Sequence, residues 1–141
     1  MSGKKILVVE DDNLQLTTLA RRLKSAGFEV VAARDGLTAI STARKEQPDL
    51  ILLDLGLPAG DGFVVLQRLG MLINTGTIPI IVVSSRPPLD NRDAALKAGA
   101  IAYIHKPVDI SVLLKTINEA LGLSPPEPPP EPPQPPPAPQ P

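Results

Sequence analysis

The sequence predicts an α/β fold in which a single parallel sheet of five strands is doubly wound, with five helices covering its two faces. Five short apolar runs alternate along the chain with stretches whose apolar residues recur at helical spacing. The runs are continuously apolar, which is typical of parallel strands that helices cover on both faces. Because crossovers between parallel strands are right-handed, this alternation leaves few possible topologies.

The expected elements follow in chain order. The strands are Ile6–Val9, Val30–Ala33, Leu50–Leu53, Ile80–Val83 and Ile101–Ile104. The helical stripes are Leu16, Leu19, Ala20 and Leu23; Ala39, Ile40 and Ala43; Val65, Leu66 and Leu69; Ala94, Ala95 and Ala98; and Leu113, Leu114, Ile117 and Leu121. Gly27, Gly99 and Gly122 stand where the first, fourth and fifth helices should stop.

The composition restricts the class of protein. Hydrophobic residues make up 43% of the 141 residues and aromatic residues only 2%, so the core must be aliphatic. No stretch approaches the roughly 20 apolar residues that cross a bilayer, and the absence of cysteine excludes disulfides and thiolate metal sites. We therefore expect a cytoplasmic protein that does not bind membranes. The net charge of the chain is −1, and residues 1–123 hold 14 basic and 13 acidic residues, a near balance that argues against direct nucleic-acid binding by this segment.

The chain divides into two segments of different composition. Twelve of the 18 residues in 124–141 are proline, so this stretch has few backbone donors and nothing to bury. We expect residues 1–123 to form one domain and residues 124–141 to be a proline-rich tail or linker with no folded domain. A second interpretation of the tail is a ligand for an aromatic-lined groove on another protein.

The residues that follow the predicted strands carry the chemistry, because ligands of such sheets bind beyond the carboxyl ends of the strands. These positions hold Glu10, Asp11 and Asp12 after the first strand, Asp54 and Gly56 after the third, Ser84 and Ser85 after the fourth, and Lys106 and Pro107 after the fifth. Converging carboxylates repel one another and favour a bound cation. Their hard oxygen atoms favour Mg²⁺, with Mn²⁺ as a possible substitute.

Together these motifs resemble the receiver domains of two-component response regulators. The motifs are the acidic residues after the first strand, Asp54-x-x-x-Pro58-x-x-Asp61-Gly62, Ser84 and Lys106-Pro107. They occur in the family's order and spacing, and the resemblance covers residues 4–122. It implies a flavodoxin-like sheet with strand order 2-1-3-4-5. It also implies that a histidine kinase or a phosphotransfer protein is the phosphodonor.

The resemblance implies a role for each acidic residue. It makes Asp54 the phosphoacceptor, and it makes Asp12, Asp54 and the backbone carbonyl of Gly56 the direct Mg²⁺ ligands. Asp11 would act through water, with Glu10 as a lesser contributor. Such an arrangement suits phosphoryl transfer, in which the protein contributes mainly positioning and positive charge.

Three further residues complete the expected site and its response. Lys106 would place a second cation beside the phosphoryl group, and Ser84 would donate a hydrogen bond to a phosphoryl oxygen. The resemblance implies that Ser84 then moves toward the phosphoryl group while Tyr103 turns inward, as a two-state switch. The face formed by the fourth helix, the fifth strand and the fifth helix would report this state to a downstream protein or to a second copy of the chain.

Some of these residues also have a purely structural interpretation. Asp12 and Asp61 precede predicted helices and can cap them. Tyr103 can be an ordinary half-buried strand aromatic. His105, the only histidine, should point away from the side of the strand that Lys106 uses.

The loops near the site suggest local departures from the family. Pro87 and Pro88 restrict the loop after the fourth strand, which predicts a smaller conformational change. Gly56 has no side chain to shield a phosphoryl group from water, whereas Arg86 can cover the group from across the site. The resemblance also implies a cis peptide bond before Pro107.

We expect a signalling domain rather than an enzyme. The alternative is a receiver-like scaffold that binds proteins without being phosphorylated, but a scaffold would not need the complete set of acidic, hydroxyl and lysine residues. A Mg²⁺-dependent phosphohydrolase that forms an aspartyl phosphate usually has a general acid two residues after its nucleophile. Gly56 occupies that position and cannot transfer a proton.

Overall fold

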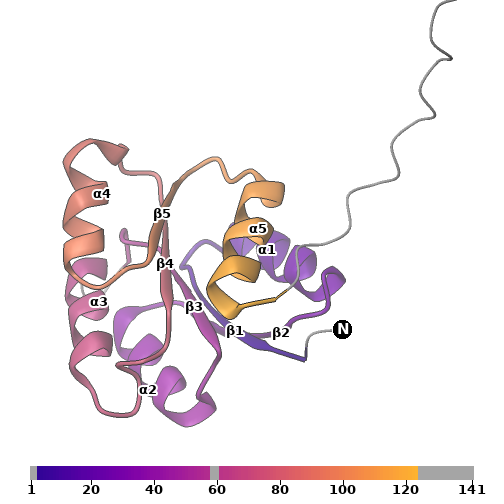
Figure 1. The fold of residues 1–141 in the computed structure, drawn as a ribbon, viewed down its shortest axis with the longest axis horizontal. Coiled ribbons are helices and arrows are strands. Elements are labelled where there is room, and N and C mark those ends of the chain that lie inside the picture. Colours follow the sequence, from indigo (N-terminus) through magenta and orange to yellow (C-terminus); the bar gives the residue numbers. More distant parts are fainter. Residues whose placement is uncertain (1–2, 58–60, 124–141) are drawn as a thin grey trace, which may run out of the picture.

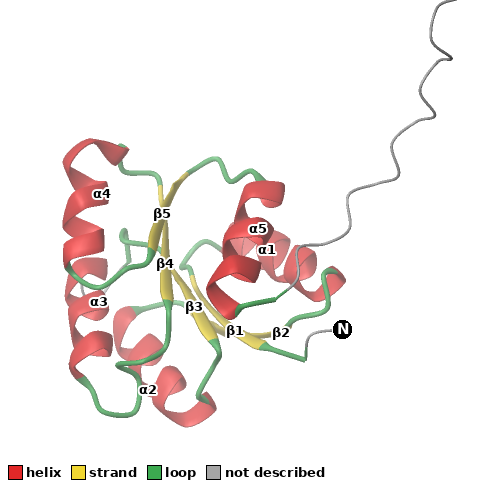
Figure 2. Ribbon diagram, in the orientation of Figure 1, coloured by secondary structure: helices red, strands yellow, loops and turns green. Residues whose placement is uncertain are grey.

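The computed structural model describes residues 3–57 and 61–123, and these residues form one five-stranded sheet with five helices (Figures 1 and 2). The elements are β1 (Lys5–Val9), α1 (Asn13–Ser25), β2 (Glu29–Ala33), α2 (Gly36–Glu46), β3 (Leu50–Leu53), α3 (Gly62–Met71), β4 (Ile80–Ser84), α4 (Pro88–Lys97), β5 (Ala102–His105) and α5 (Ile110–Leu121). All strand pairs are parallel, in the order β2-β1-β3-β4-β5. The predicted fold class and strand order are confirmed.

Helices cover both faces of the sheet, and each face has its own hydrophobic cluster. Helices α2, α3 and α4 pack on one face, where they meet Leu7, Ile51 and Val82. Helices α1 and α5 pack on the other face, where they meet Val8 and Leu52. Neighbouring strand residues therefore point to opposite faces and are both buried, which explains why the strands appear in the sequence as continuous apolar runs.

The strand boundaries agree with the predicted ones to within one residue. Strand β1 begins one residue earlier than expected, β4 includes Ser84, and β5 runs from Ala102 to His105. Gly27, Gly99 and Gly122 all have positive φ angles near helix ends, as predicted for helix stops. The predicted tail, residues 124–141, and Pro58 of the motif lie outside the described residues.

Aspartate side chains begin four of the five helices. Asp12, Asp35, Asp61 and Asp109 precede α1, α2, α3 and α5, and each carboxylate accepts a backbone N–H from the first turn. Helix α4 begins differently, because Pro87 precedes it and provides no side-chain cap. Its first turn is also irregular, since Leu89 and Asp90 have non-helical backbone angles. Among the described helices, α4 thus has the least regular start.

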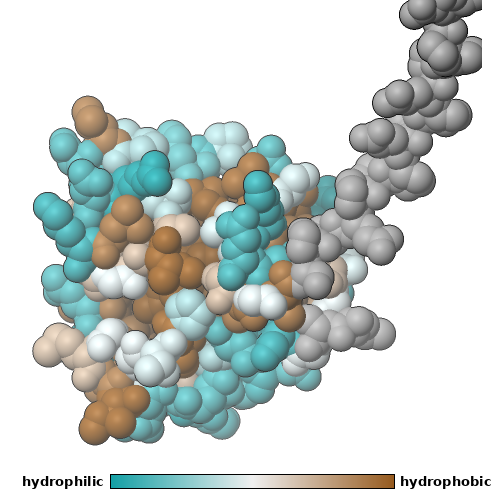
Figure 3. Space-filling view, viewed as in Figure 1, coloured by the Kyte–Doolittle hydropathy of each residue, from teal (hydrophilic) through white to brown (hydrophobic). Residues whose placement is uncertain are grey.

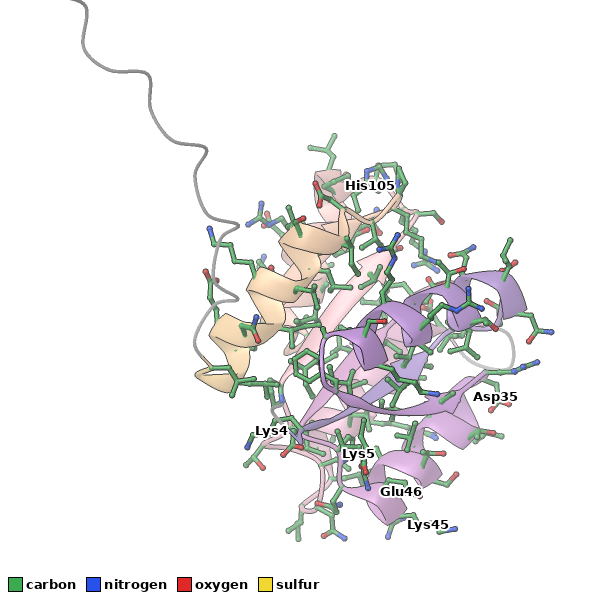
Figure 4. All side chains as sticks on the ribbon, turned by 90° about the vertical axis from the view of Figure 1, so that its right-hand side faces the viewer. Lys4, Lys5, Asp35, Lys45, Glu46 and His105 are labelled. Atoms are coloured by element: carbon green, nitrogen blue, oxygen red, sulfur yellow. The ribbon has the colours of Figure 1, made fainter. Side chains whose placement is uncertain are left out.

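The parallel arrangement brings the carboxyl ends of the strands to one edge of the sheet. The N–H of Asp54 bonds to Val9 O at 3.1 Å, and the N–H of Lys106 bonds to Ser84 O at 2.8 Å. Lys5 and Glu46 lie at the opposite end of the molecule from His105, which ends β5 (Figure 4). Within residues 3–57 and 61–123, no helix has both the length and the apolar content of a membrane span. The cytoplasmic location stays a prediction.

Candidate functional site

Asp54 occupies the centre of the carboxyl edge, immediately after β3. The residue is only 8% exposed. Its Oδ1 accepts the N–H of Gly56 at 3.0 Å, and its Oδ2 accepts a hydrogen bond from Lys106 Nζ at 3.1 Å. Both carboxylate oxygens thus have a donor that fixes the orientation of the group.

The start of α3 packs closely against the loop that carries Asp54. Gly62 donates its N–H to Leu55 O at 3.0 Å, and a Cβ atom at Gly62 would overlap the backbone of Leu55. Only glycine fits here. Asp61 caps α3 by accepting the N–H of Phe63 at 3.0 Å, so the predicted helix start at Asp61 and Gly62 is confirmed.

Lys106 reaches into the site from the end of β5 and connects three elements. Its ammonium group donates to Glu10 Oε2 at 2.8 Å, to Asp54 Oδ2 at 3.1 Å and to Gln15 Oε1 at 2.7 Å. Burial alone would lower the pKa of Lys106, but the hydrogen bonds to Glu10 and Asp54 outweigh it and raise the pKa above its ordinary value. The lysine therefore stays charged. The peptide bond between Lys106 and Pro107 is cis, as predicted.

The acidic residues after β1 do not all enter the site. Glu10, Asp11 and Asp54 each place a carboxylate oxygen within 4.8 Å of the others, an arrangement that can hold a metal ion. Asp12, which was predicted as a direct ligand, is outside this group. Its carboxylate caps α1 by accepting the N–H of Gln15 at 2.9 Å. The structure thus replaces Asp12 with Glu10 in the candidate metal-binding group and keeps Asp11.

Glu10 has a larger part in the site than the sequence indicated. Burial raises the pKa of Glu10 above its ordinary value; the hydrogen bond from Lys106 lowers it, and the nearby Asp54 carboxylate raises it again. Its second oxygen accepts the N–H of Asp12 at 3.1 Å. A buried carboxylate next to another carboxylate is unfavourable unless cations compensate for it.

Gln15 was missed by the sequence analysis. It lies in the first turn of α1, and its side-chain oxygen accepts from Lys106 across 91 positions of sequence. Glutamine in a first helical turn is common, so no signal in the sequence points to this contact. Gln15 thus provides a third hydrogen-bond acceptor for the Lys106 ammonium, in addition to Glu10 and Asp54.

The predicted switch residues converge on the loop between β4 and α4. Ser84 is buried, and its hydroxyl oxygen accepts the N–H of Arg86 at 3.0 Å. The hydroxyl of half-buried Tyr103 donates to Arg86 O at 2.6 Å. His105 is exposed, and its ring nitrogen lies 3.2 Å from Ser85 O. Within the described residues, Ser84 therefore makes its side-chain hydrogen bond with this loop and not with Asp54.

A hollow of about 610 Å³ opens beside Asp54. Glu10, Gln15, Asp54 and Lys106 form its polar end. The remaining lining is mostly apolar and comes from β1, α1, β3, β4 and the residues after Lys106. Gly56 adds no side chain, and a Cβ there would meet only Asp54 Oδ1, at 3.7 Å.

Comparison with known proteins identifies the family. A family model of the response regulator receiver domain matches residues 6–118. This chain belongs to that family, whose members are the receiver domains of two-component systems and act in signalling.

Similar sequences are response regulators of different lengths. The chain is 37% identical over 121 residues to the transcriptional regulatory protein PrrA of Mycobacterium tuberculosis, and the match covers 86% of this chain and 51% of PrrA. It is 34% identical over 117 residues to protein PilH of Pseudomonas aeruginosa, covering 83% of this chain and 97% of PilH. The chain thus spans about half the length of PrrA and nearly all of PilH.

Solved structures of receiver domains have the same fold. A CheY-like receiver domain protein from Methanospirillum hungatei matches with a TM-score of 0.80 and 34% identity, covering 86% of this chain and 95% of that one. The receiver domain of the sensor histidine kinase PA1611 from Pseudomonas aeruginosa matches with a TM-score of 0.79 and 30% identity, covering 86% and 99%. That structure has a magnesium ion coordinated in its active site cleft.

Proposed function

We propose that this chain accepts a phosphoryl group on Asp54, with Mg²⁺ bound, from a histidine kinase or a phosphotransfer protein. The observation that carries the proposal is the buried Asp54 carboxylate held between the Lys106 ammonium and the Glu10 and Asp11 carboxylates. The fold does not need this cluster for its stability. Apolar side chains packed at the same positions would often stabilise a protein as well as buried charges do, or better. Charged groups concentrated at a carboxyl edge are instead what a reaction site needs.

The residues fit a hard divalent cation. Glu10, Asp11 and Asp54 offer carboxylate oxygens within 4.8 Å of one another, and the backbone carbonyl of Gly56 is the further ligand that we propose. Oxygen ligands without histidine or cysteine suit Mg²⁺ and also Mn²⁺. When bound, the cation would neutralise charge between the carboxylate and the phosphoryl group.

Asp54, Lys106 and Ser84 have different roles in the proposed phosphoryl transfer. An Asp54 oxygen forms a bond to the phosphorus atom of a phosphohistidine, the P–N bond breaks, and the imidazole leaves with the bonding electron pair. Lys106 attracts the equatorial phosphoryl oxygens, where the charge is spread in the transition state. Ser84 accepts the N–H of Arg86, so its own hydroxyl proton remains for a phosphoryl oxygen. The hollow beside Asp54 provides room for the imidazole.

We propose that a partner recognises the phosphorylated state at the face formed by α4, β5 and α5. Hydrophobic side chains gather over β5 between α4 and α5 (Figure 3). Exposed hydrophobic residues of these elements are Leu96 in α4, Ile101 just before β5 and Val112 in α5. Tyr103 in β5 connects this face to the loop after Ser84 through its bond to Arg86. A downstream protein or a second copy of the chain is the proposed partner, and we propose no enzymatic turnover of an external substrate.

The experiment that tests this function is an intact-mass measurement after incubation with a small phosphodonor and Mg²⁺. The wild type should gain one phosphoryl group, and Asp54→Asn should gain none because its amide is not a nucleophile. Removal of Mg²⁺ with a chelator should abolish the gain. If neither a small donor nor a phosphorylated histidine kinase transfers a group, the proposal fails and a phosphorylation-independent scaffold remains.

A further inference from the structure

Arg86 lies at a junction between the site and its switch. Its backbone N–H bonds to the Ser84 hydroxyl at 3.0 Å, and its backbone carbonyl accepts the Tyr103 hydroxyl at 2.6 Å. A single residue of the loop between β4 and α4 therefore holds both side chains that the switch uses. A displacement of the Arg86 backbone would therefore alter both hydrogen bonds.

The side chain of Arg86 leaves this loop and crosses to the start of α3. Its guanidinium lies 5.7 Å from the centre of the Phe63 ring and 3.8 Å from Asp61 Oδ1. One of its nitrogens is also 3.5 Å from the carbonyl oxygen of Leu55, the residue after Asp54. Arginine is suited to this position because its planar group can stack on a ring and pair with a carboxylate at once.

These side-chain contacts are not needed to build α3. Asp61 already caps the helix through the N–H of Phe63, and Leu55 O already accepts the N–H of Gly62 at 3.0 Å. The Arg86 and Asp61 side chains are 38% and 51% exposed, so their ion pair is a surface interaction. Its removal should therefore leave the fold intact and change only the position of the loop.

We propose that Arg86 is a positioning residue, whose side chain anchors the loop between β4 and α4 to Asp61 and Phe63. The anchor favours, before any phosphoryl group is present, the position of Tyr103 in which its hydroxyl bonds to Arg86 O, and we call this position the inward state. In this state the Ser84 hydroxyl keeps its proton for a phosphoryl oxygen, since it accepts and does not donate the bond to Arg86. The anchored loop is thus compatible with both the free and the phosphorylated protein. Tyr103 of the unphosphorylated protein is therefore already partly shifted toward the inward state.

The sequence provides a direct reporter of this state. Tyr103 is the only tyrosine, and the chain has no tryptophan. Incorporation of 3-fluorotyrosine gives a fluorine NMR signal from position 103 alone, which separates inward from outward ring positions. The measurement uses the full chain without phosphodonor or Mg²⁺, so a failure of phosphoryl transfer would not affect it.

Four variants make the test specific. Arg86→Ala and Asp61→Asn should each lower the ratio of inward to outward Tyr103 about threefold, which corresponds to about 0.7 kcal/mol and lies within the range of an exposed ion pair. Asparagine retains the cap of α3, so Asp61→Asn removes the ion pair alone. Arg86→Lys should have an intermediate effect, because lysine keeps the charge but not the planar stacking. Arg92→Ala, at an exposed arginine of α4, is the matched control and should leave the signal unchanged.

The outcomes separate the anchor from a general loss of structure. Unchanged Tyr103 signals in both Arg86→Ala and Asp61→Asn overturn the proposal. A change in Arg86→Ala without one in Asp61→Asn also overturns the proposal as stated, because the contact with Asp61 would then have no part in anchoring the loop. If Arg86→Ala proves unfolded by circular dichroism, Asp61→Asn and Arg86→Lys decide the question in the same way.

Discussion

The two ends of the sheet each hold a lysine between two carboxylates, yet the two clusters differ in burial. At the amino end, Lys5 lies 3.1 Å from Glu46 and 4.0 Å from Glu29, with side-chain exposures of 28%, 35% and 71% (Figure 4). At the carboxyl end, Lys106 lies 2.8 Å from Glu10 and 3.1 Å from Asp54, with exposures of 16%, 7% and 10%. Similar distances thus occur in very different surroundings.

The difference in burial gives the two ion-pair clusters different energetics. Exposed pairs such as that of Lys5 contribute about 0 to 1 kcal/mol, since water solvates both partners nearly as well. Buried charges lose their hydration, and their mutual attraction only partly offsets that loss. The buried cluster at the carboxyl end therefore costs free energy of folding, which a contribution to stability does not explain. We expect variants of the two clusters to differ in their effects on stability and on phosphoryl uptake.

The largest effect is expected for Lys106→Met. It should slow phosphoryl uptake by about 100-fold, because a preorganised positive group next to the transferred phosphoryl oxygens is lost. It should also lower the free energy of unfolding by about 1 to 3 kcal/mol at neutral pH, since two carboxylates lose their common donor. Intact mass against time and urea unfolding measure the two effects. An unchanged rate of phosphoryl uptake would show that Lys106 takes no part in the transfer.

The next effect distinguishes the acids that follow β1. Asp11→Asn should weaken Mg²⁺ binding about tenfold or more, since even outer partners of metal ligands contribute at least that much. Asp12→Asn is the matched control and should bind Mg²⁺ like the wild type, because asparagine also caps α1. Isothermal titration calorimetry with Mg²⁺ gives both affinities. Loss of affinity in Asp12→Asn alone would restore the ligand set that the sequence predicted.

A smaller effect is the dependence of stability on pH that Glu10 causes. Its pKa is raised above the ordinary 4.5 in the folded protein, so the folded state binds this proton more tightly than the unfolded chain does. The contribution is fully present below pH 4.5 and is lost as the pH rises through the raised value. Urea unfolding at several pH values should therefore show the wild type losing stability relative to Glu10→Gln over this window. A difference that grows in favour of the wild type would contradict the assignment.

The smallest effect is expected for Lys5→Met. Removing this exposed ion pair should change the free energy of unfolding by less than about 1 kcal/mol and leave phosphoryl uptake unaltered. The same two assays that apply to Lys106→Met apply here. A loss of stability as large as that of Lys106→Met would show that the contrast in burial does not govern the two clusters.

The sequence by itself determined the order of the elements and the position of the charged and polar groups at the carboxyl edge of the sheet. Hydrophobic periodicity and helix-stop residues act over a few neighbouring positions, so the five strands could be placed to within one residue. The groups at the carboxyl edge, including Asp54, Ser84 and Lys106, followed from the geometry of parallel strands, which end at one edge. The Asp61 cap was likewise a local signal.

Only the tertiary structure decided which two of the three consecutive acids lie close to Asp54. The choice depends on where β1 ends and α1 begins: Asp12 becomes the helix cap, and Glu10 bonds to Lys106. The contact between Gln15 and Lys106 and the reach of Arg86 to Asp61 were equally beyond the sequence. These contacts depend on how side chains of distant elements are oriented in space, and no local pattern of residues specifies that orientation.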